Sequence, residues 1–176
     1  VERYVGGHPM AGRERSGAVA ARPDLFVGRP WVLTPTVHTS EAAVHRVRAL
    51  ALDLGAVPAV LAPEDHDAAV ARVSHVPQLA ASLVAARLLD ADDAAVSLSG
   101  QGLRDVTRIA ASDPQLWVQI LAGNPGPVAE VLRGLQHDLD VLVRSLERLA
   151  ADPEALGARG DLATVLDAGV RGHARI

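Results

Sequence analysis

Residues 31–61 read WVLTPTVHTSEAAVHRVRALALDLGAVPAVL and predict a strand, a helix and a second strand. Trp31 to Thr34 and Val57 to Leu61 are short runs rich in β-branched and aromatic residues, as is typical of strands. Between them, Ser40 is a natural N-cap, apolar residues recur at helical spacing, and Gly55 ends the helix. A series of this kind is the closing half of an α/β sheet.

Nearer the N-terminus, the run Val5-Gly6-Gly7-His8-Pro9-Met10-Ala11-Gly12 follows a further strand end, expected at Arg3 to Val5. Its two glycines allow a sharp turn and the close approach of a ligand. Pro9 disfavours the helical conformation at His8, so the imidazole is expected to be presented from a loop. A histidine placed there suits proton transfer near neutral pH, although a turn histidine that caps local backbone explains the residue types equally well.

From Pro63 onward the sequence predicts helices only. The first is expected to end near Asp90 and to be kinked near Val73, because Pro77 removes one backbone hydrogen bond. Polar side chains gather at this kink, namely Ser74, His75 and Gln78. Such a cluster favours a binding site, with a kink in the core that has no function as the alternative.

A second polar group follows the break at Gly100-Gln101-Gly102. This break resembles a dinucleotide-binding fingerprint only faintly, because Asp105 stands where the third glycine is needed. The helix after it places Arg104 and Arg108 one turn apart on one face, which is either a solvated face or a site for carboxylates. A new helix then starts at Ser112-Asp113-Pro114 and carries Trp117.

The long segment from Pro127 to about Ala151 has the clearest helical periodicity. Its apolar residues alternate steps of four and three, at Val128, Leu132, Leu135, Leu139, Leu142, Leu146 and Leu149. This coiled-coil-like seam needs a partner helix, from the same chain or from a second subunit. A last helix is expected from Asp161 to Val170.

Composition narrows the class of protein. The chain has 176 residues, of which 49% are apolar, and a net charge of −4 without a basic stripe, which argues against a nucleic-acid partner. It contains no cysteine, and every cation among its 17 basic residues is arginine, so thiolate and lysine chemistry are excluded. We found no membrane span or signal peptide, and we expect a cytoplasmic location.

Taken together, three stretches resemble the TyrA family, the prephenate and arogenate dehydrogenases of tyrosine biosynthesis. They are Gly6 to Gly12 with Glu14 and Ser16-Gly17; Ser74-His75-Val76-Pro77; and Gly102 to Ala110 through Ser112-Asp113-Pro114 to Trp117. The resemblance implies the last strands of a Rossmann-type nucleotide-binding domain at 1–62 and an all-helical substrate-binding and dimerisation domain at 63–176. The family's glycine-rich nucleotide-binding turn is absent, so we expect a chain that lacks the front of the family's protein.

The resemblance also implies oxidative decarboxylation of prephenate or arogenate with NAD or NADP, in a homodimer. It assigns the uptake of the substrate's hydroxyl proton to His8 and the binding of a substrate carboxylate to Arg108. Further substrate contacts, partly from the second subunit, are expected from His75, Gln78, Arg104, Asp105, Ser112 and Trp117, with Glu14 near the entrance. The cofactor is expected to contact Gly7, Pro9 and Met10, and no metal site is expected.

Two departures from the family leave the choice between prephenate and arogenate open. Gln78 stands where many members carry a second histidine, and arginines flank Glu14 where threonine and lysine are common. The alternatives are an inactive dimerisation and substrate-domain fragment, or another dehydrogenase with a helical second domain. The second usually acts through a lysine, which this chain lacks, and a metal-dependent hydrolase is disfavoured because the seven histidines are scattered.

Overall fold

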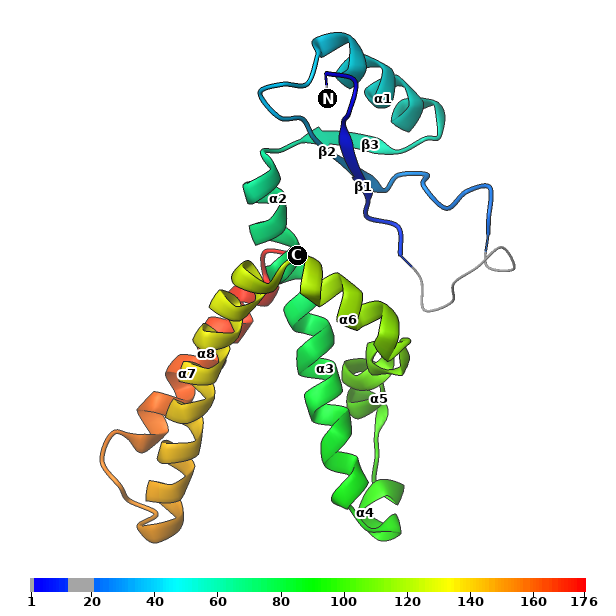
Figure 1. The fold of residues 1–176 in the computed structure, drawn as a ribbon. Helices are drawn as coiled ribbons and strands as arrows, with labels where there is room; N and C mark the ends of the chain where they lie inside the picture. Colours follow the sequence, from blue (N-terminus) through cyan, green and yellow to red (C-terminus); the bar gives the residue numbers. More distant parts are fainter. Residues whose placement is uncertain (1, 13–20) are drawn as a thin grey trace. The chain divides into compact units, whose positions relative to one another are not determined.

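The computed structural model describes residues 2–12 and 21–176. The chain divides into two compact units, Val1–Val128 and Ala129–Ile176, each of which is described by itself. In the first unit a small sheet is followed by helices alone, whereas the second is entirely helical (Figure 1). The expected class, an α/β remnant followed by a helical part, is therefore confirmed.

The sheet contains three strands in the described residues, β1 (Gly6–Pro9), β2 (Pro30–Thr34) and β3 (Val57–Val60), in that order. Strand β1 pairs antiparallel with β2, and β3 pairs parallel with β2 on its other side. Helix α1 (Glu41–Asp53) joins β2 to β3 and packs against both (Figure 1). Leu33 of the central strand is fully buried, which places the core between this strand and α1.

The predicted position of the first strand was wrong by a few residues. His8 lies within β1 and pairs with Val32, not in a loop after a strand at Arg3 to Val5. The two glycines before it do not make a turn. They lie in β1, where the side chains of β2 come close to their α-carbons and leave little room for a larger residue. A Cβ on Gly6 would lie 2.3 Å from the Thr34 hydroxyl oxygen.

The ends of α1 follow the prediction. The Ser40 hydroxyl accepts a hydrogen bond from the backbone N–H of Ala43 at 3.3 Å, as an N-cap should. Gly55 follows the helix with a φ of +75°, a conformation that glycine adopts without steric cost. The expected apolar face is only partly covered, because Ala43 and Ala51 are buried whereas Leu50 is 51% exposed.

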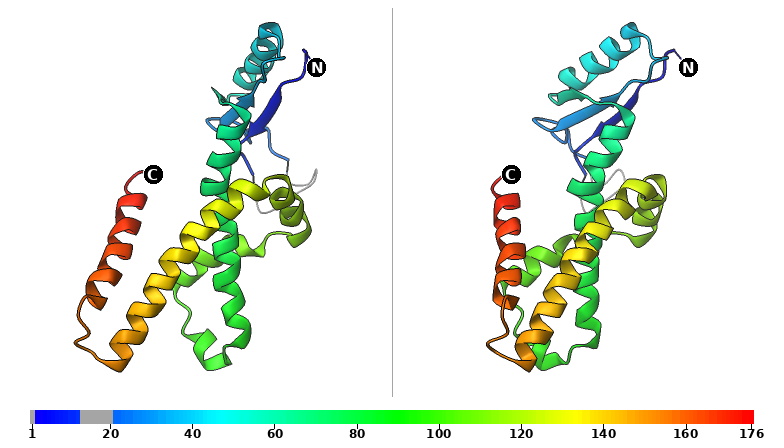
Figure 2. Two further views of the ribbon diagram at one scale, coloured as in Figure 1. Left: turned by 60° about the vertical axis from the view of Figure 1, so that its left-hand side comes forward. Right: turned by 90° about the vertical axis from the view of Figure 1, so that its left-hand side faces the viewer.

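The kinked helix is also present. Helix α2 (Pro63–Val70) passes through a π-helical turn (Ala71–His75) into α3 (Val76–Ala86) and a final 3₁₀ turn (Arg87–Asp90), along one continuous path (Figure 2). Within the π turn the N–H of Val76 bonds to the carbonyl of Ala71, five residues back. The interruption lies directly before Pro77, which has no N–H to donate.

The remaining helices of the first unit follow α3 in the chain, and α5 with the turn after it packs against α3. They are α4 (Asp93–Ser97), α5 (Gln101–Thr107) with a 3₁₀ turn (Arg108–Ala111), and α6 (Pro114–Gly123). The expected single helix through Arg104 and Arg108 therefore tightens at Arg108, and this turn packs against α3. The Asp113 carboxylate caps α6 by accepting from the N–H of Gln115 at 2.9 Å.

The second unit is formed by most of α7 (Pro125–Ala151) and by α8 (Ala158–His173). Both helices are longer than predicted. Arg148 of α7 lies 3.6 Å from the Asp161 carboxylate of α8 and also donates to the carbonyl of Leu156 in the connection. The predicted apolar seam is not fully covered within the chain, because Leu135, Leu139 and Leu146 are 42% to 56% exposed. None of the described helices combines the length and the apolar character needed to cross a membrane.

Candidate active site

The site is built around His8 at the sheet and around the interrupted helix that follows β3. The Nδ1 atom of His8 lies 2.8 Å from Nε2 of His66 on α2, and the two rings meet edge to face. Burial lowers the pKa of His8 below its usual value, and the nearby His66 and His75 lower it further because positive charges repel one another. His8 is therefore neutral at neutral pH and able to accept a proton.

His66 is itself held by a carboxylate. Its Nδ1 atom lies 2.9 Å from Oδ1 of Asp67, the next residue of α2. The His66 side chain is only 16% exposed, whereas the Asp67 side chain is 49% exposed and reaches solvent. The result is a row of three side chains that runs from the surface of α2 to the half-buried His8 in β1.

A second buried histidine lies in the π turn. His75 is 6% exposed, and its Nδ1 accepts a hydrogen bond from the Asn124 amide at 3.3 Å. The same Asn124 nitrogen donates to the carbonyl of Asp67 at 2.8 Å, which ties the end of α6 to α2. Burial lowers the pKa of His75, and its ring meets that of Trp117 edge to face with centroids 6.2 Å apart.

Two polar side chains share one backbone carbonyl on the other side of α3. The buried Gln78 amide donates to the carbonyl of Ile109 at 3.0 Å, and the Ser112 hydroxyl donates to the same oxygen at 2.8 Å. This carbonyl belongs to the 3₁₀ turn that begins at Arg108. The turn is thereby fixed against α3, and the position of the Arg108 backbone is fixed with it.

These elements enclose a pocket of about 530 Å³ that lies entirely within the first unit. One wall comes from β1, a second from the π turn and α3, and a third from the 3₁₀ turn and α6. The lining residues are His8, Pro9, Met10, Gly12, Val73, Ser74, Pro77, Gln78, Arg108, Ile109, Ser112, Asp113, Leu116, Trp117 and Ile120. Arg108 makes no hydrogen bond or ion pair with the described part of the chain, so its guanidinium is available to a ligand.

Most of the residues singled out from the sequence meet at this pocket. Of the expected substrate contacts, Gln78, Arg108, Ser112 and Trp117 line it, together with the expected cofactor contacts Pro9 and Met10. His75 lies behind the wall, against Trp117. Gly7 faces the Trp31 ring, while Arg104 and Asp105 are exposed on α5 and do not line the pocket. Glu14 lies outside the described residues.

His66, Asp67 and Asn124 were not predicted as part of the site. Asn124 follows α6 directly, where a buried amide between two helices can both donate and accept hydrogen bonds. His66 precedes an aspartate in the first helix after β3, close to the end of a strand that runs parallel to its neighbour. That position was the available signal, because the parallel strand ends of α/β sheets are common places for functional side chains.

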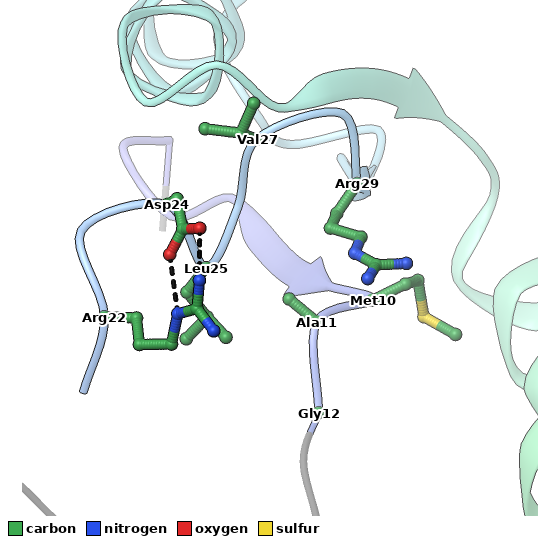
Figure 3. Close-up of a pocket in the computed structure, with 8 residues that line it drawn as sticks. All are labelled: Met10, Ala11, Gly12, Arg22, Asp24, Leu25, Val27 and Arg29. Atoms are coloured by element: carbon green, nitrogen blue, oxygen red, sulfur yellow. Dashed lines mark hydrogen bonds and ion pairs between the residues drawn. The ribbon is translucent and has the colours of Figure 1, made fainter. Parts of the chain in front are cut away.

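A second pocket, of about the same volume, shares Met10 and Gly12 with the first (Figure 3). The Arg22 guanidinium and the Asp24 carboxylate form an ion pair in its wall, with a shortest distance of 2.6 Å. Arg29 extends toward Met10 and Ala11. Its lining residues flank the segment 13–20, which is outside the described residues, and we assign it no function. No cluster of potential metal ligands occurs in residues 2–12 and 21–176.

The chain matches two family profiles in sequence. Residues 1–60 match "Prephenate dehydrogenase, nucleotide-binding domain" and residues 62–158 match "Prephenate dehydrogenase, dimerization domain". Among curated proteins it is 42% identical over 174 residues to the probable prephenate dehydrogenase NovF of Streptomyces niveus. It is 33% identical over 153 residues to the prephenate dehydrogenase of Bacillus subtilis. These matches cover 98% and 85% of this chain, but only 48% and 41% of the two relatives, so the chain spans less than half of their length.

A solved structure is similar in fold as well as in sequence. The prephenate dehydrogenase of A. aeolicus, crystallised with hydroxyphenyl propionate and NAD+, superposes with a TM-score of 0.81 at 29% identity. The match covers 99% of this chain and 60% of that protein.

Proposed function

Since the chain belongs to the prephenate dehydrogenase family, we propose that it forms the substrate site of an enzyme that oxidises and decarboxylates prephenate or arogenate. One observation carries the proposal. A neutral histidine, His8, and the Arg108 guanidinium, which is unpaired among the described residues, line the same pocket although they are 100 residues apart in the sequence. A base and a carboxylate-binding cation are what this reaction requires of the protein.

His8 acts on the substrate's hydroxyl group. Hydride leaves the ring carbon that carries this hydroxyl, and the hydroxyl proton passes to His8 at the same time. Carbon dioxide is then lost, the ring becomes aromatic, and the proton returns to the oxygen of the product phenol. The lowered pKa of His8 supports this role, because the imidazole must be unprotonated before it can accept a proton.

Arg108 binds a carboxylate of the substrate. A guanidinium grips a carboxylate with two parallel hydrogen bonds, which fixes orientation as well as position. The apolar wall formed by Leu116, Trp117 and Ile120 suits the ring of the same molecule. Holding both ends of a small rigid substrate supplies much of the rate enhancement in reactions of this type.

The cofactor that this reaction needs is NAD or NADP, which accepts the hydride when bound. Pro9 and Met10 fit the nicotinamide end of such a cofactor, because they line the pocket next to His8. The match of residues 1–60 to a nucleotide-binding domain supports this assignment. The glycine-rich turn that binds the phosphates is not found in this sequence. The residue that distinguishes NAD from NADP follows that turn, so both cofactors are proposed.

We place the boundary between the two domains at residues 62 and 63, at the start of α2. The two family matches, which end at residue 60 and begin at residue 62, support this division. We also infer that the chain forms a homodimer through its helical part. The name of the matching profile and the exposed leucines of α7 support the dimer. In such a dimer, the exposed Arg104 and Asp105 of α5 would contact the substrate bound to the partner subunit, as predicted. A cytoplasmic location stays a prediction from the sequence.

The experiment has a binding arm and a turnover arm. In the first, hydroxyphenyl propionate is titrated into the protein and the heat of binding is measured. In the second, prephenate and arogenate are supplied in turn with NAD+ or NADP+, and reduced nicotinamide is followed by absorbance. Turnover supports the whole proposal. The ratio of the rates with prephenate and with arogenate then decides which of the two is the preferred substrate, a choice that Gln78 leaves open. Binding without turnover supports the alternative of a substrate-domain fragment, and the absence of both overturns the proposal.

A further inference from the structure

The row Asp67–His66–His8 determines which nitrogen of His8 carries a proton. Asp67 contributes a carboxylate oxygen, which can only accept, so the Nδ1 atom of His66 must donate to it across 2.9 Å. The Nε2 atom of a neutral His66 then bears a lone pair and accepts. At 2.8 Å from it, the Nδ1 atom of His8 must carry the hydrogen.

From this chain of donors we infer that His66, held by Asp67, is a positioning residue that fixes His8 in the Nδ1–H tautomer and leaves its Nε2 lone pair free to accept the substrate proton. The inference rests on the proposed function for the identity of that proton. The tautomer itself follows from the geometry of the row when His66 carries a single ring proton. In a neutral histidine side chain free in solution the Nε2–H tautomer is the commoner one, so the row reverses the ordinary preference of the base.

The arrangement also restrains the imidazole ring. The side chain of His8 projects from a short strand, and its edge-to-face contact with His66 adds a fixed orientation to the hydrogen bond. When His8 takes up a proton it becomes a better donor to His66, and the hydrogen bond between them strengthens because it is then charge-assisted. His66 thus assists in the protonated state without touching the substrate.

Other charged groups also face His8 and its surroundings. His75 approaches from the π turn and lowers the pKa of His8. Arg108 and Asp113 line the same pocket from the 3₁₀ turn and from the start of α6. In the described residues, His66 alone makes a side-chain hydrogen bond to the His8 imidazole, and Asp67 alone ion-pairs with His66. The test therefore targets these two residues.

The first experiment measures the tautomer directly in the unliganded protein, with ¹⁵N-labelled histidine and long-range ¹H–¹⁵N correlation spectra. We expect the protonated-type shift at Nδ1 of His8 and the unprotonated-type shift at Nε2. The His66→Leu variant should lose this pattern, while His66→Gln should retain it, because a glutamine carbonyl can still accept from Nδ1. His45→Leu, at an exposed histidine of α1, is the matched control. An Nε2–H tautomer in the wild-type protein overturns the inference.

The second experiment uses turnover of prephenate. His66→Leu should lower kcat by roughly a hundredfold, at the lower end of what a positioned base contributes, with KM nearly unchanged. His66→Gln should restore part of the rate, and Asp65→Asn should not change it, whereas Asp67→Asn should lower it. Equal rates for all variants overturn the inference. If the wild-type protein shows the expected tautomer but neither binds hydroxyphenyl propionate nor turns over prephenate, the proposed function fails and the role of His66 in setting the tautomer stands.

Discussion

A Cβ atom added to Gly6 would lie 2.3 Å from the hydroxyl oxygen of Thr34, its partner across β1 and β2. We therefore expect Gly6→Ala to shift β1 away from β2 and to lower the free energy of unfolding by about 1–3 kcal/mol, the usual cost of overpacking. Urea unfolding followed by circular dichroism measures it. Gly134→Ala, in open space within α7, should be neutral or stabilising by up to about 1 kcal/mol. If Thr34→Ala does not rescue Gly6→Ala, the clash is not the cause.

Arg108 should control affinity, because its guanidinium lines the pocket and has no hydrogen-bond or ion-pair partner in the part of the chain that the structure describes. Arg108→Ala is expected to weaken the binding of hydroxyphenyl propionate by roughly tenfold to a hundredfold, as the loss of a charged hydrogen bond would do. Isothermal titration calorimetry measures this loss. Arg87→Ala, at an exposed arginine after α3, is the control.

His8→Asn should instead leave the affinity for hydroxyphenyl propionate nearly intact and abolish turnover. Equal losses of affinity and turnover in both the His8 and the Arg108 variants would show that the two roles are wrongly assigned.

Asn124 should matter for stability because one buried nitrogen serves two acceptors. Asn124→Ala leaves the Asp67 carbonyl and His75 Nδ1 without their donor, so we expect a loss of about 1–3 kcal/mol in the free energy of unfolding. Asn124→Asp should cost at least as much, since a carboxylate oxygen would face the carbonyl. Gln119→Ala, at an exposed position of α6, controls for the loss of an amide. Thermal or urea unfolding of all three decides the question.

Stability should fall in mild acid. The pKa values of His8 and His75 are both lowered from 6.5 in the folded chain. As the pH falls below about 6.5, the unfolded chain binds protons at these sites before the folded chain does, so the free energy of unfolding decreases; above this pH they contribute no slope. His75→Gln should make the pH dependence shallower, whereas His137→Gln, on the exposed side of α7, should not. A wild-type stability that is flat between neutral pH and pH 5 would contradict this account.

Local signals in the sequence predicted much of the fold. Ser40, Pro63 and Pro77 each act on the backbone next to them. As predicted, a helix starts after Ser40, another starts at Pro63, and the helix is interrupted before Pro77. The glycines before His8 were misinterpreted because their cause is not local. They allow the close approach of β2, whose paired residues are 26 and 28 positions away in the chain (Gly7 with Leu33, Gly6 with Thr34). That approach leaves no mark in the neighbouring sequence.

The same contrast holds for the site. The residue types at His8 and Arg108 indicate a base and an anion-binding cation, and the fold brings both to one pocket. The contact between His8 and His66 spans 58 residues and depends on how α2 leaves the sheet. Neither spacing nor composition carries that information. It follows only from the tertiary arrangement.

The π turn at Ala71–His75 holds one residue more than a regular helical turn, since the N–H of Val76 bonds to the carbonyl of Ala71, five residues back. Removing one residue within the turn would restore regular hydrogen bonding and leave the later part of α3 close to its present phase. Removing one residue from the regular part of α3 would instead rotate every later residue by about 100° about the helix axis. A single-codon deletion is therefore expected to be better tolerated within the π turn than in the regular helix that follows it.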